Sequence, residues 1–159
     1  MLIRGPLGAG KTTVARLLAA RIGGEYISID RILDEHHLEE WENDYISEGS
    51  FLRANRIVAD LAGPRLAAGV PVVIDGNFYY RAAIEDLQRR LDFPSYVFTL
   101  KVPLEVCIER DRRRAPSLGR EATEEVYVKS TEFDYGMEID ATAPLEAVVT
   151  EVVARLRPA

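Results

Sequence analysis

The stretch GPLGAGKT, which runs from Gly5 to Thr12, constrains the fold of this chain more than any other segment. It lies between a short apolar run at residues 1–4 and a segment at residues 11–22 whose apolar residues recur on one helical face. This pattern predicts a strand, a glycine-rich turn and a helix. Glycines let successive backbone N–H groups point inward around an anion, and the start of a helix adds partial positive charge. The segment therefore predicts a βα unit with a phosphate site between its strand and its helix.

The remaining chain predicts an alternation of strands and helices. Residues 72–75, VVID, form an apolar run without polar alternation, which is typical of a buried central strand. Strands separated by helices are joined by right-handed crossovers, so we expect a parallel sheet covered on both faces, a three-layer α/β/α sandwich. Strands are expected at residues 1–4, 26–30, 72–75, 96–102 and 135–139, and helices at residues 11–22, 32–45, 50–69, 81–91, 104–114, 121–132 and 145–156.

Two of the expected helices carry particular signals. The segment at residues 32–45 has a helical but largely polar pattern, with few apolar anchors. We expect Ser50 to cap the helix that follows it. The Gly63-Pro64 pair should interrupt that helix before Gly69 ends it.

Composition restricts the classes of protein to which the chain can belong. At 159 residues it can bury a sizeable core, so we expect a single domain over residues 1–159. Its 20 basic and 26 acidic residues give a net charge of −6, so neither a nucleic-acid nor an acidic-membrane partner is expected. No apolar run of ~18 residues is present, so no membrane span is expected. Residues 1–4 lead straight into the glycine loop without a signal peptide, and the lone Cys107 can form no internal disulfide, so we expect a cytoplasmic protein.

The spacing G-x-x-x-x-G-K-[ST] assigns roles to the residues of the loop. Lys11 can reach the β- and γ-phosphates of a nucleotide and the Thr12 hydroxyl can bind Mg²⁺, so ATP and Mg²⁺ are the expected cofactors. Ligands of a parallel sheet bind at the carboxyl ends of its strands, so Asp30 and Asp75 should share one edge with the loop. The nucleotide-binding residues predicted in this way are Gly5, Gly8, Ala9, Gly10, Lys11, Thr12 and Thr13.

With these motifs in place, the chain resembles the small P-loop kinases. That group contains shikimate kinase, gluconate kinase, adenylylsulfate kinase, polynucleotide kinase and the zeta-toxin-like proteins. The resemblance covers nearly the whole chain. It implies a parallel sheet of five strands in the order 2-3-1-4-5, a site for ATP and Mg²⁺, and a short arginine-bearing lid at about residues 112–122.

The resemblance implies roles for the acidic residues. Asp30 would face the acceptor hydroxyl as general base or orienting group; N-capping of the following helix is the alternative. Asp75 stands where a Walker-B-like carboxylate would hold Mg²⁺ or bind the acceptor, and a turn-forming Asp-Gly is the alternative. Asn77 and the aromatic residues after it would form a pocket wall, although Phe78 fits the core equally well.

The resemblance also implies roles for three arginines. The segment IERDRRRAPSLGR resembles the lid, in which Arg110 and Arg114 would act as catalytic residues together with Lys11 and Asp30. Basic residues at a helix C-terminus also favour the helix dipole, which is the alternative. Arg53, in EGSFLR, resembles the residue with which shikimate kinase holds its substrate carboxylate; otherwise it is a solvated helix residue. Residues 139–146 resemble the loop that cups adenine.

These assignments together predict an ATP-dependent phosphotransferase that acts on a hydroxyl of a small molecule. A polynucleotide or nucleotide kinase is one alternative, and a nucleotide-binding switch or NTPase without an acceptor is another. Ser28 replaces an aspartate of shikimate kinase, and DGNFYY replaces its glycine run, so the sequence points away from shikimate. The acceptor, the choice between ATP and GTP, and the choice between monomer and homodimer stay open, as does the choice between metal and acceptor for Asp75.

Overall fold

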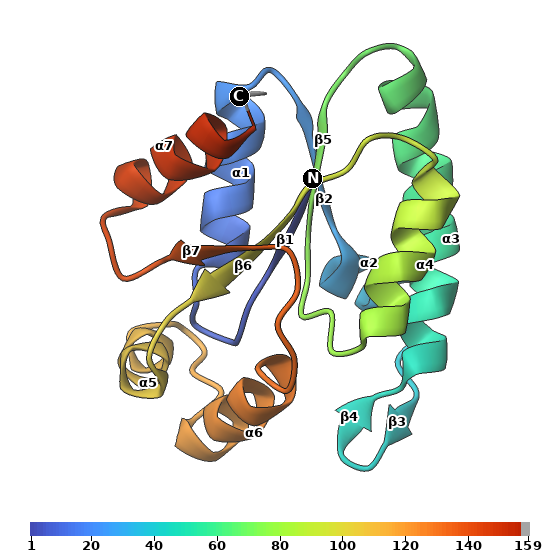
Figure 1. Cartoon of the computed structure of the whole chain (residues 1–159). Coiled ribbons are helices and arrows are strands. Elements are labelled where there is room, and N and C mark those ends of the chain that lie inside the picture. Colours follow the sequence, from blue (N-terminus) through green and yellow to red (C-terminus); the bar gives the residue numbers. More distant parts are fainter. Residues whose placement is uncertain (157–159) are drawn as a thin grey trace.

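A parallel sheet of five strands forms the centre of the computed structural model, which describes residues 1–156 (Figure 1). Its order is β2-β5-β1-β6-β7, and every neighbouring pair is parallel. Numbered among themselves in chain order, these strands have the expected order 2-3-1-4-5. The strands are β1 Leu2–Arg4, β2 Glu25–Ser28, β5 Val72–Asp75, β6 Val97–Lys101 and β7 Met137–Asp140.

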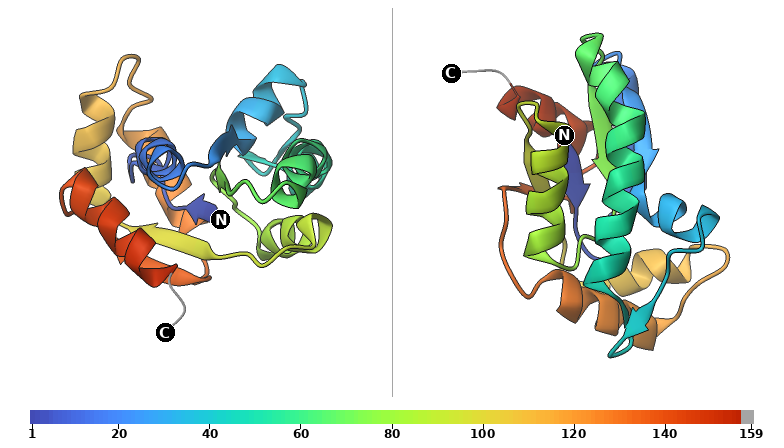
Figure 2. Two further views of the ribbon diagram at one scale, coloured as in Figure 1. Left: turned by 90° about the horizontal axis from the view of Figure 1, so that it is seen from above. Right: turned by 90° about the vertical axis from the view of Figure 1, so that its right-hand side faces the viewer.

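Helices cover both faces of the sheet, as Figure 2 shows from two further directions. Helices α1 (Lys11–Arg21) and α7 (Leu145–Arg155) pack on one face, and α3 (Glu48–Ala67) and α4 (Arg81–Leu91) pack on the other. Alternate residues of β5 enter the two resulting cores, because successive side chains of a strand point to opposite faces. The apolar run of this strand thus reflects burial on both sides, and the three-layer α/β/α sandwich is confirmed.

Two further helices lie beyond the carboxyl ends of the strands. They are α5 (Leu104–Arg112) and α6 (Arg120–Ser130), which Figure 1 shows below the sheet. The loop between them contains the segment expected to form the lid. Within residues 1–156, no helix combines the length and apolar character that a membrane crossing requires.

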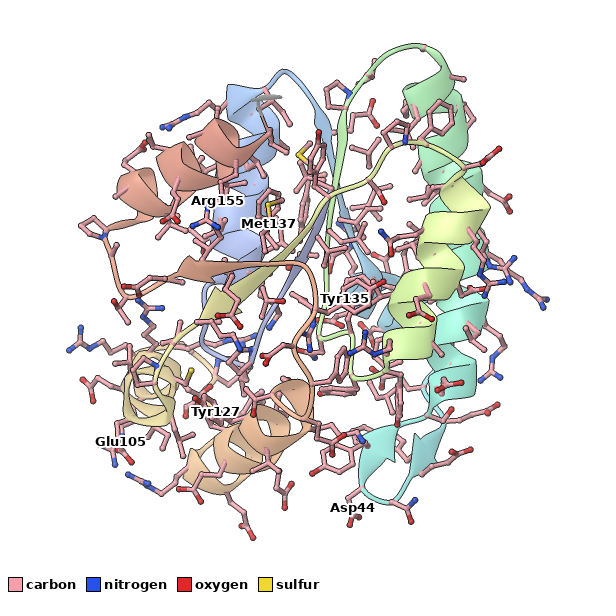
Figure 3. All side chains as sticks on the ribbon, viewed as in Figure 1. Asp44, Glu105, Tyr127, Tyr135, Met137 and Arg155 are labelled. Carbon is pink, nitrogen blue, oxygen red and sulfur yellow. The ribbon has the colours of Figure 1, made fainter. Side chains whose placement is uncertain are left out.

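The prediction of a helix at residues 32–45 is wrong. Helix α2 covers only Ile29–Glu35, and a hairpin of β3 (Trp41–Glu42) and β4 (Tyr45–Ile46) follows. Asn43 and Asp44 both have positive φ, 49° and 68°, as the two central residues of a tight hairpin turn require. Figure 3 shows Asp44 at the tip of this hairpin. The polar segment had no continuous apolar face to hold a helix against the core, so the turn residues decided its structure.

Helix α3 also differs from the prediction, in its N-cap and in its continuity through Gly63-Pro64. Its N-cap is Ser47 rather than Ser50, and the Ser47 hydroxyl accepts a hydrogen bond from the Ser50 backbone N–H at 3.2 Å. The Gly63-Pro64 pair does not interrupt it, since the helix continues to Ala67. Ala62 is fully buried against the sheet, and this packing outweighs the backbone hydrogen bond that proline cannot donate.

Candidate active site

The glycine loop between β1 and α1 requires glycine for steric reasons. Gly8 has a φ of +80°, and a Cβ atom there would lie 2.6 Å from the backbone oxygen of Cys107. Gly10 has a φ of +89° and forms the N-cap of α1. These left-handed conformations aim the loop backbone at the space beyond the sheet, where an anion can be bound.

Lys11 extends back along the loop. Its ammonium group donates a hydrogen bond to the Pro6 carbonyl at 2.9 Å, and the side chain is almost fully buried. Burial lowers the pKa of Lys11, whereas the nearby charges of Asp30 and Asp75 act in the opposite direction. A buried cation with a single carbonyl partner is well placed to exchange that partner for phosphate oxygens.

Asp75 lies at the end of β5, directly beside the start of α1. Its two carboxylate oxygens accept hydrogen bonds from the Thr12 hydroxyl at 2.8 Å and from the Tyr26 hydroxyl at 2.7 Å. Sequence reasoning assigned Thr12 and Asp75 to Mg²⁺ but missed Tyr26, whose partner on a neighbouring strand only the sheet order reveals.

The pair of Thr12 and Asp75 has the right chemistry for a magnesium ion. Within residues 1–156, no group of three or more His, Cys, Asp or Glu residues could hold a metal ion. Mg²⁺ usually takes few protein ligands, all of them oxygen atoms, and completes its shell with water and substrate phosphates. One hydroxyl and one carboxylate beside a phosphate loop fit that requirement.

Asp30 lies across from the loop, in the first turn of α2. The N-cap of this helix is Ser28, whose hydroxyl accepts a hydrogen bond from the Arg31 N–H, so Asp30 does not cap it. Instead, the Asp30 carboxylate accepts a hydrogen bond from the Asn77 N–H at 3.3 Å. Burial raises the pKa of Asp30 to about 6, against the opposing effect of the Lys11 charge.

A cavity of about 750 Å³ joins the glycine loop, Lys11 and Thr12 to Asp30, while Asp75 lies behind Thr12 and does not line it. Most of its lining residues come from the glycine loop and from the segments that sequence reasoning selected. It also includes residues that this reasoning missed, above all Glu39 and Ile46. The lining residues are Leu7, Gly8, Gly10, Lys11, Thr12, Thr13, Ser28, Asp30, Glu39, Ile46, Asn77, Arg110, Arg114 and Leu118.

The two expected lid arginines differ in their contacts. The Arg110 guanidinium donates to the carbonyls of Gly8, Ala9 and Ala141, at 3.3, 3.4 and 2.9 Å, and so connects the glycine loop to the loop after β7. It also lines a second hollow of about 240 Å³, formed mainly by small and aliphatic residues of α1 and of the segment after β7. Arg114 lines the main cavity and lies close enough to Lys11 to lower the pKa of that lysine.

The lid loop is ordered by Asp111, which sequence reasoning did not single out. Its carboxylate accepts hydrogen bonds from the Ser117 hydroxyl at 2.6 Å and from the backbone N–H groups of Leu118 and Gly119. These hydrogen bonds lower the pKa of Asp111. The carboxylate therefore holds Leu118 at the mouth of the cavity.

Two groups expected near the acceptor lie elsewhere. Arg53 does not line the cavity; its guanidinium pairs with Glu40 at 3.0 Å and donates to the Leu38 carbonyl. Phe78 is fully buried and Tyr79 is 6% exposed, and both belong to the core, which is the alternative considered for Phe78. Of the segment NFYY, only Asn77 lines the cavity.

Another hollow, of about 620 Å³, lies between α6 and the ends of β6 and β7. Its only lining residue from the glycine loop is Pro6. Neither Asp30 nor Asp75 lines it, and neither do the residues that are hydrogen-bonded to them. The cavity at the glycine loop is therefore the candidate active site.

Comparison with known proteins identifies the family. The family model AAA_33, described as "AAA domain", matches residues 1–132. The chain belongs to this family. Among curated proteins, no sequence matches this AAA_33 protein significantly.

Solved structures support the fold of this AAA_33 protein. A sugar kinase from Janibacter sp. HTCC2649 has a TM-score of 0.76 at 21% identity, covering 96% of this chain and 91% of that one. A gluconokinase from Sinorhizobium meliloti 1021 has a TM-score of 0.71 at 21% identity, covering 96% and 88%. Shikimate kinase from Aquifex aeolicus VF5 has a TM-score of 0.64 at 17% identity, covering 98% and 94%. The small P-loop kinase fold inferred from the sequence is confirmed.

Proposed function

We propose that the protein is a kinase that transfers the γ-phosphoryl group of ATP to a hydroxyl group of a small molecule. One observation carries the proposal: the Asp30 carboxylate faces the Lys11 and Thr12 end of the glycine loop across a single cavity. A phosphoryl donor at the loop and an alcohol beside Asp30 would then be neighbours. The fold relatives named a sugar kinase, a gluconokinase and a shikimate kinase agree with such chemistry.

The residues of the site divide the work of such a transfer. The loop N–H groups, Lys11 and Arg114 would neutralise charge on the phosphates, while Thr12 and Asp75 would hold Mg²⁺, which supplies further neutralisation when bound. Asp30, with a pKa of about 6, is largely ionised at pH 7 and can accept the proton that the acceptor hydroxyl releases as its oxygen attacks phosphorus. The products would be a phosphate ester, ADP and a proton.

Arg110 has a different role in this proposal. Because it binds the carbonyls of Gly8 and Ala141 and lines the smaller hollow, we assign it to the nucleoside end of the donor rather than to the transferring group. The small, aliphatic lining of that hollow suits a planar base. This assignment differs from the expectation that both lid arginines close over the γ-phosphate, which stays a prediction for Arg114.

The alternatives considered from the sequence receive less support. A polynucleotide acceptor needs cations along its path, but Arg53 is paired with Glu40 and lies outside the cavity. An NTPase without an acceptor needs no room beside the donor, yet the cavity extends past the loop to Asp30, Asn77 and Ile46. Phosphoryl transfer to a small alcohol uses all of this space.

The proposal is tested by measuring ADP release and phosphorylated product over a panel of alcohols, with purified wild-type protein and three variants, one of which is a control. Lys11→Ala should abolish most Mg·ATP binding. Asp30→Asn should keep Mg·ATP affinity but lose transfer by ~10²–10⁴-fold, because it removes only the proton acceptor. Asp34→Asn, an exposed acid on the same helix outside the cavity, is the matched control. Transfer at the wild-type rate by Asp30→Asn would show that Asp30 is not the base.

A further inference from the structure

The main cavity is lined by charges of both signs. The cations Lys11, Arg110 and Arg114 come from the end of the glycine loop, from α5 and from the loop after α5, and we assign them to the donor. The carboxylates are those of Asp30 in α2, on which the Lys11 charge acts, and of Glu39 before β3; Asn77 and Ile46 also line the cavity. With the cations assigned to the donor, these two carboxylates are the charges left at the acceptor end of the cavity.

The cations near the acceptor end are already paired. The Arg53 guanidinium lies 3.0 Å from a Glu40 carboxylate oxygen, and Arg31 lies 2.6 Å from Glu35. The cations that line the cavity, Lys11, Arg110 and Arg114, are the ones assigned to the donor. A carboxylate or phosphate on the acceptor would lose its hydration and meet two like charges without compensation, which is unfavourable.

Glu39 is held in place by its neighbours along the chain. The Leu38 carbonyl accepts a hydrogen bond from Arg53. The Glu40 N–H donates to the Ser50 hydroxyl at 3.0 Å, and the Glu40 carbonyl accepts from the Ser47 N–H at 2.7 Å. Glu39 thus stands between two anchored residues that are tied to the start of α3.

Glu39 is an exposed residue that lines the cavity, and its carboxylate has no hydrogen-bond or ion-pair partner within residues 1–156. Burial is the main cause of the raised pKa of Asp30, and the charge of Glu39 adds to it, so the two carboxylates are close enough to repel each other. A cation placed between them would relieve this repulsion and would partner the free carboxylate.

Building on the proposed function, we propose that the phosphoryl acceptor is an amino alcohol or amino sugar, whose protonated amine pairs with Glu39 while its hydroxyl faces Asp30. Ile46 would contact the carbon skeleton. Glu39 then acts as a specificity-determining residue, because it distinguishes cationic from neutral and anionic alcohols. Its effect should appear in the KM of the acceptor rather than in kcat.

Two matched sets of acceptors test the inference. Glucosamine, glucose and glucuronate share one pyranose skeleton and differ in charge, and serinol, glycerol and glycerate form an open-chain set of the same kind. A wider panel of amino sugars, amino alcohols, polyols and hydroxy acids ranks the acceptors first. We expect the best acceptor to carry an amine, and the amine member of each matched set to have the lowest KM.

Variants at the acceptor end complete the test. Glu39→Gln should raise the KM of the amine acceptor at least about tenfold, with kcat and the KM of neutral acceptors nearly unchanged. Glu42→Gln, an exposed residue of β3 that does not line the cavity, is the matched control and should change neither. Circular dichroism and Mg·ATP affinity should match the wild type in both variants.

The outcomes separate the inference from the proposed function. If the best acceptor is neutral or anionic, or if Glu39→Gln affects all acceptors equally, the inference is wrong while the kinase assignment stands. If no alcohol of the whole panel accepts phosphate, the proposed function and the inference both fail.

Discussion

Asp30 shows how one residue can serve function at a cost to stability. Its pKa is raised from 3.8 to about 6, chiefly because burial disfavours the ionised carboxylate. Its one backbone donor, the Asn77 N–H at 3.3 Å, does not offset the loss of water. Between about pH 4 and pH 6 the folded protein therefore binds a proton that the unfolded chain has released, so stability falls as the pH rises through this window.

We therefore predict that Asp30→Asn stabilises the protein at pH 7. Asparagine has no charge to desolvate and can still accept the hydrogen bond from the Asn77 N–H. The gain in the free energy of unfolding should disappear near pH 3, where the aspartate is protonated in the folded state and largely so in the unfolded chain. Chemical denaturation at the two pH values measures the difference. A loss of stability at pH 7 would mean that the charge of Lys11 outweighs the burial of Asp30.

Tyr26 is a positioning residue for the proposed metal site. Its hydroxyl donates to the Asp75 oxygen that does not bind Thr12, and so fixes the orientation of the carboxylate. Tyr26→Phe should raise the Mg²⁺ concentration needed for half-maximal ATP turnover several-fold, because partners of this kind typically tune metal affinity. Tyr96→Phe, a half-exposed tyrosine outside the site, is the control. An unchanged Mg²⁺ requirement in Tyr26→Phe would contradict the assignment.

At the scale of elements, the glycines of this chain fall into two groups. Gly8 lies in a turn that only glycine fits, against the backbone of Cys107 in α5. Gly49 lies in α3, and the side-chain atoms nearest to the position that a Cβ atom would take there are a guanidinium nitrogen of Arg53 at 3.5 Å and the Ser47 hydroxyl at 3.8 Å. A substitution by alanine therefore has opposite consequences in the two elements.

The prediction for these two glycines follows from their surroundings. Gly49→Ala should raise the free energy of unfolding by ~0.5–1 kcal/mol, because alanine reduces the freedom of the unfolded chain and its Cβ meets only ordinary van der Waals contacts in the helix. Gly8→Ala should abolish most Mg·ATP binding, because its Cβ would displace the loop from the Cys107 carbonyl. Thermal unfolding and nucleotide titration of both variants measure these effects. Normal nucleotide affinity in Gly8→Ala would show that the loop can shift without loss of its anion site.

At the scale of the whole molecule, helix α6, which follows the lid loop, contacts the β3–β4 hairpin. The Tyr45 hydroxyl, on the β3–β4 hairpin, donates to the Glu125 carbonyl of α6 at 3.4 Å. Lys129 of α6 lies 5.4 Å from the centre of the Tyr45 ring and 5.0 Å from that of Tyr80, within cation–π range. If α5 and α6 move when the donor binds, the β3–β4 hairpin should therefore move or become more ordered with them.

We predict that nucleotide binding protects both regions from hydrogen exchange. With Mg²⁺ and a non-hydrolysable ATP analogue, exchange should slow in residues 113–119 and, to a smaller extent, in residues 41–46. In the Asp111→Asn variant without nucleotide, the amides of the lid loop should exchange faster. The reason is that asparagine is a weaker hydrogen-bond acceptor for the Ser117 hydroxyl and the Gly119 N–H than the carboxylate is. Identical exchange with and without the analogue would mean that the loop is not a lid.

The sequence by itself predicted the parallel sheet and the glycine loop between its first strand and helix, whereas the order of the strands was implied by the resemblance to the small P-loop kinases. A strand that is buried on both faces requires an apolar run such as VVID. A left-handed turn requires glycines such as those of GPLGAGKT. Both signals are local, so they can be read from the sequence. It also predicted that Asp30 and Asp75 lie near the loop, because parallel strands end at one edge.

Only the tertiary structure decided the details of the acceptor end. The hairpin at residues 41–46, the pairing of Arg53 with Glu40 and the position of Glu39 depend on contacts between segments whose own patterns are weak. The same holds for Arg110, which binds the carbonyls of Gly8 and Ala141 from opposite ends of the chain. Such side chains have several possible partners within reach. Packing and charge in the folded state decide which partner each one contacts, and the neighbouring sequence does not specify that choice.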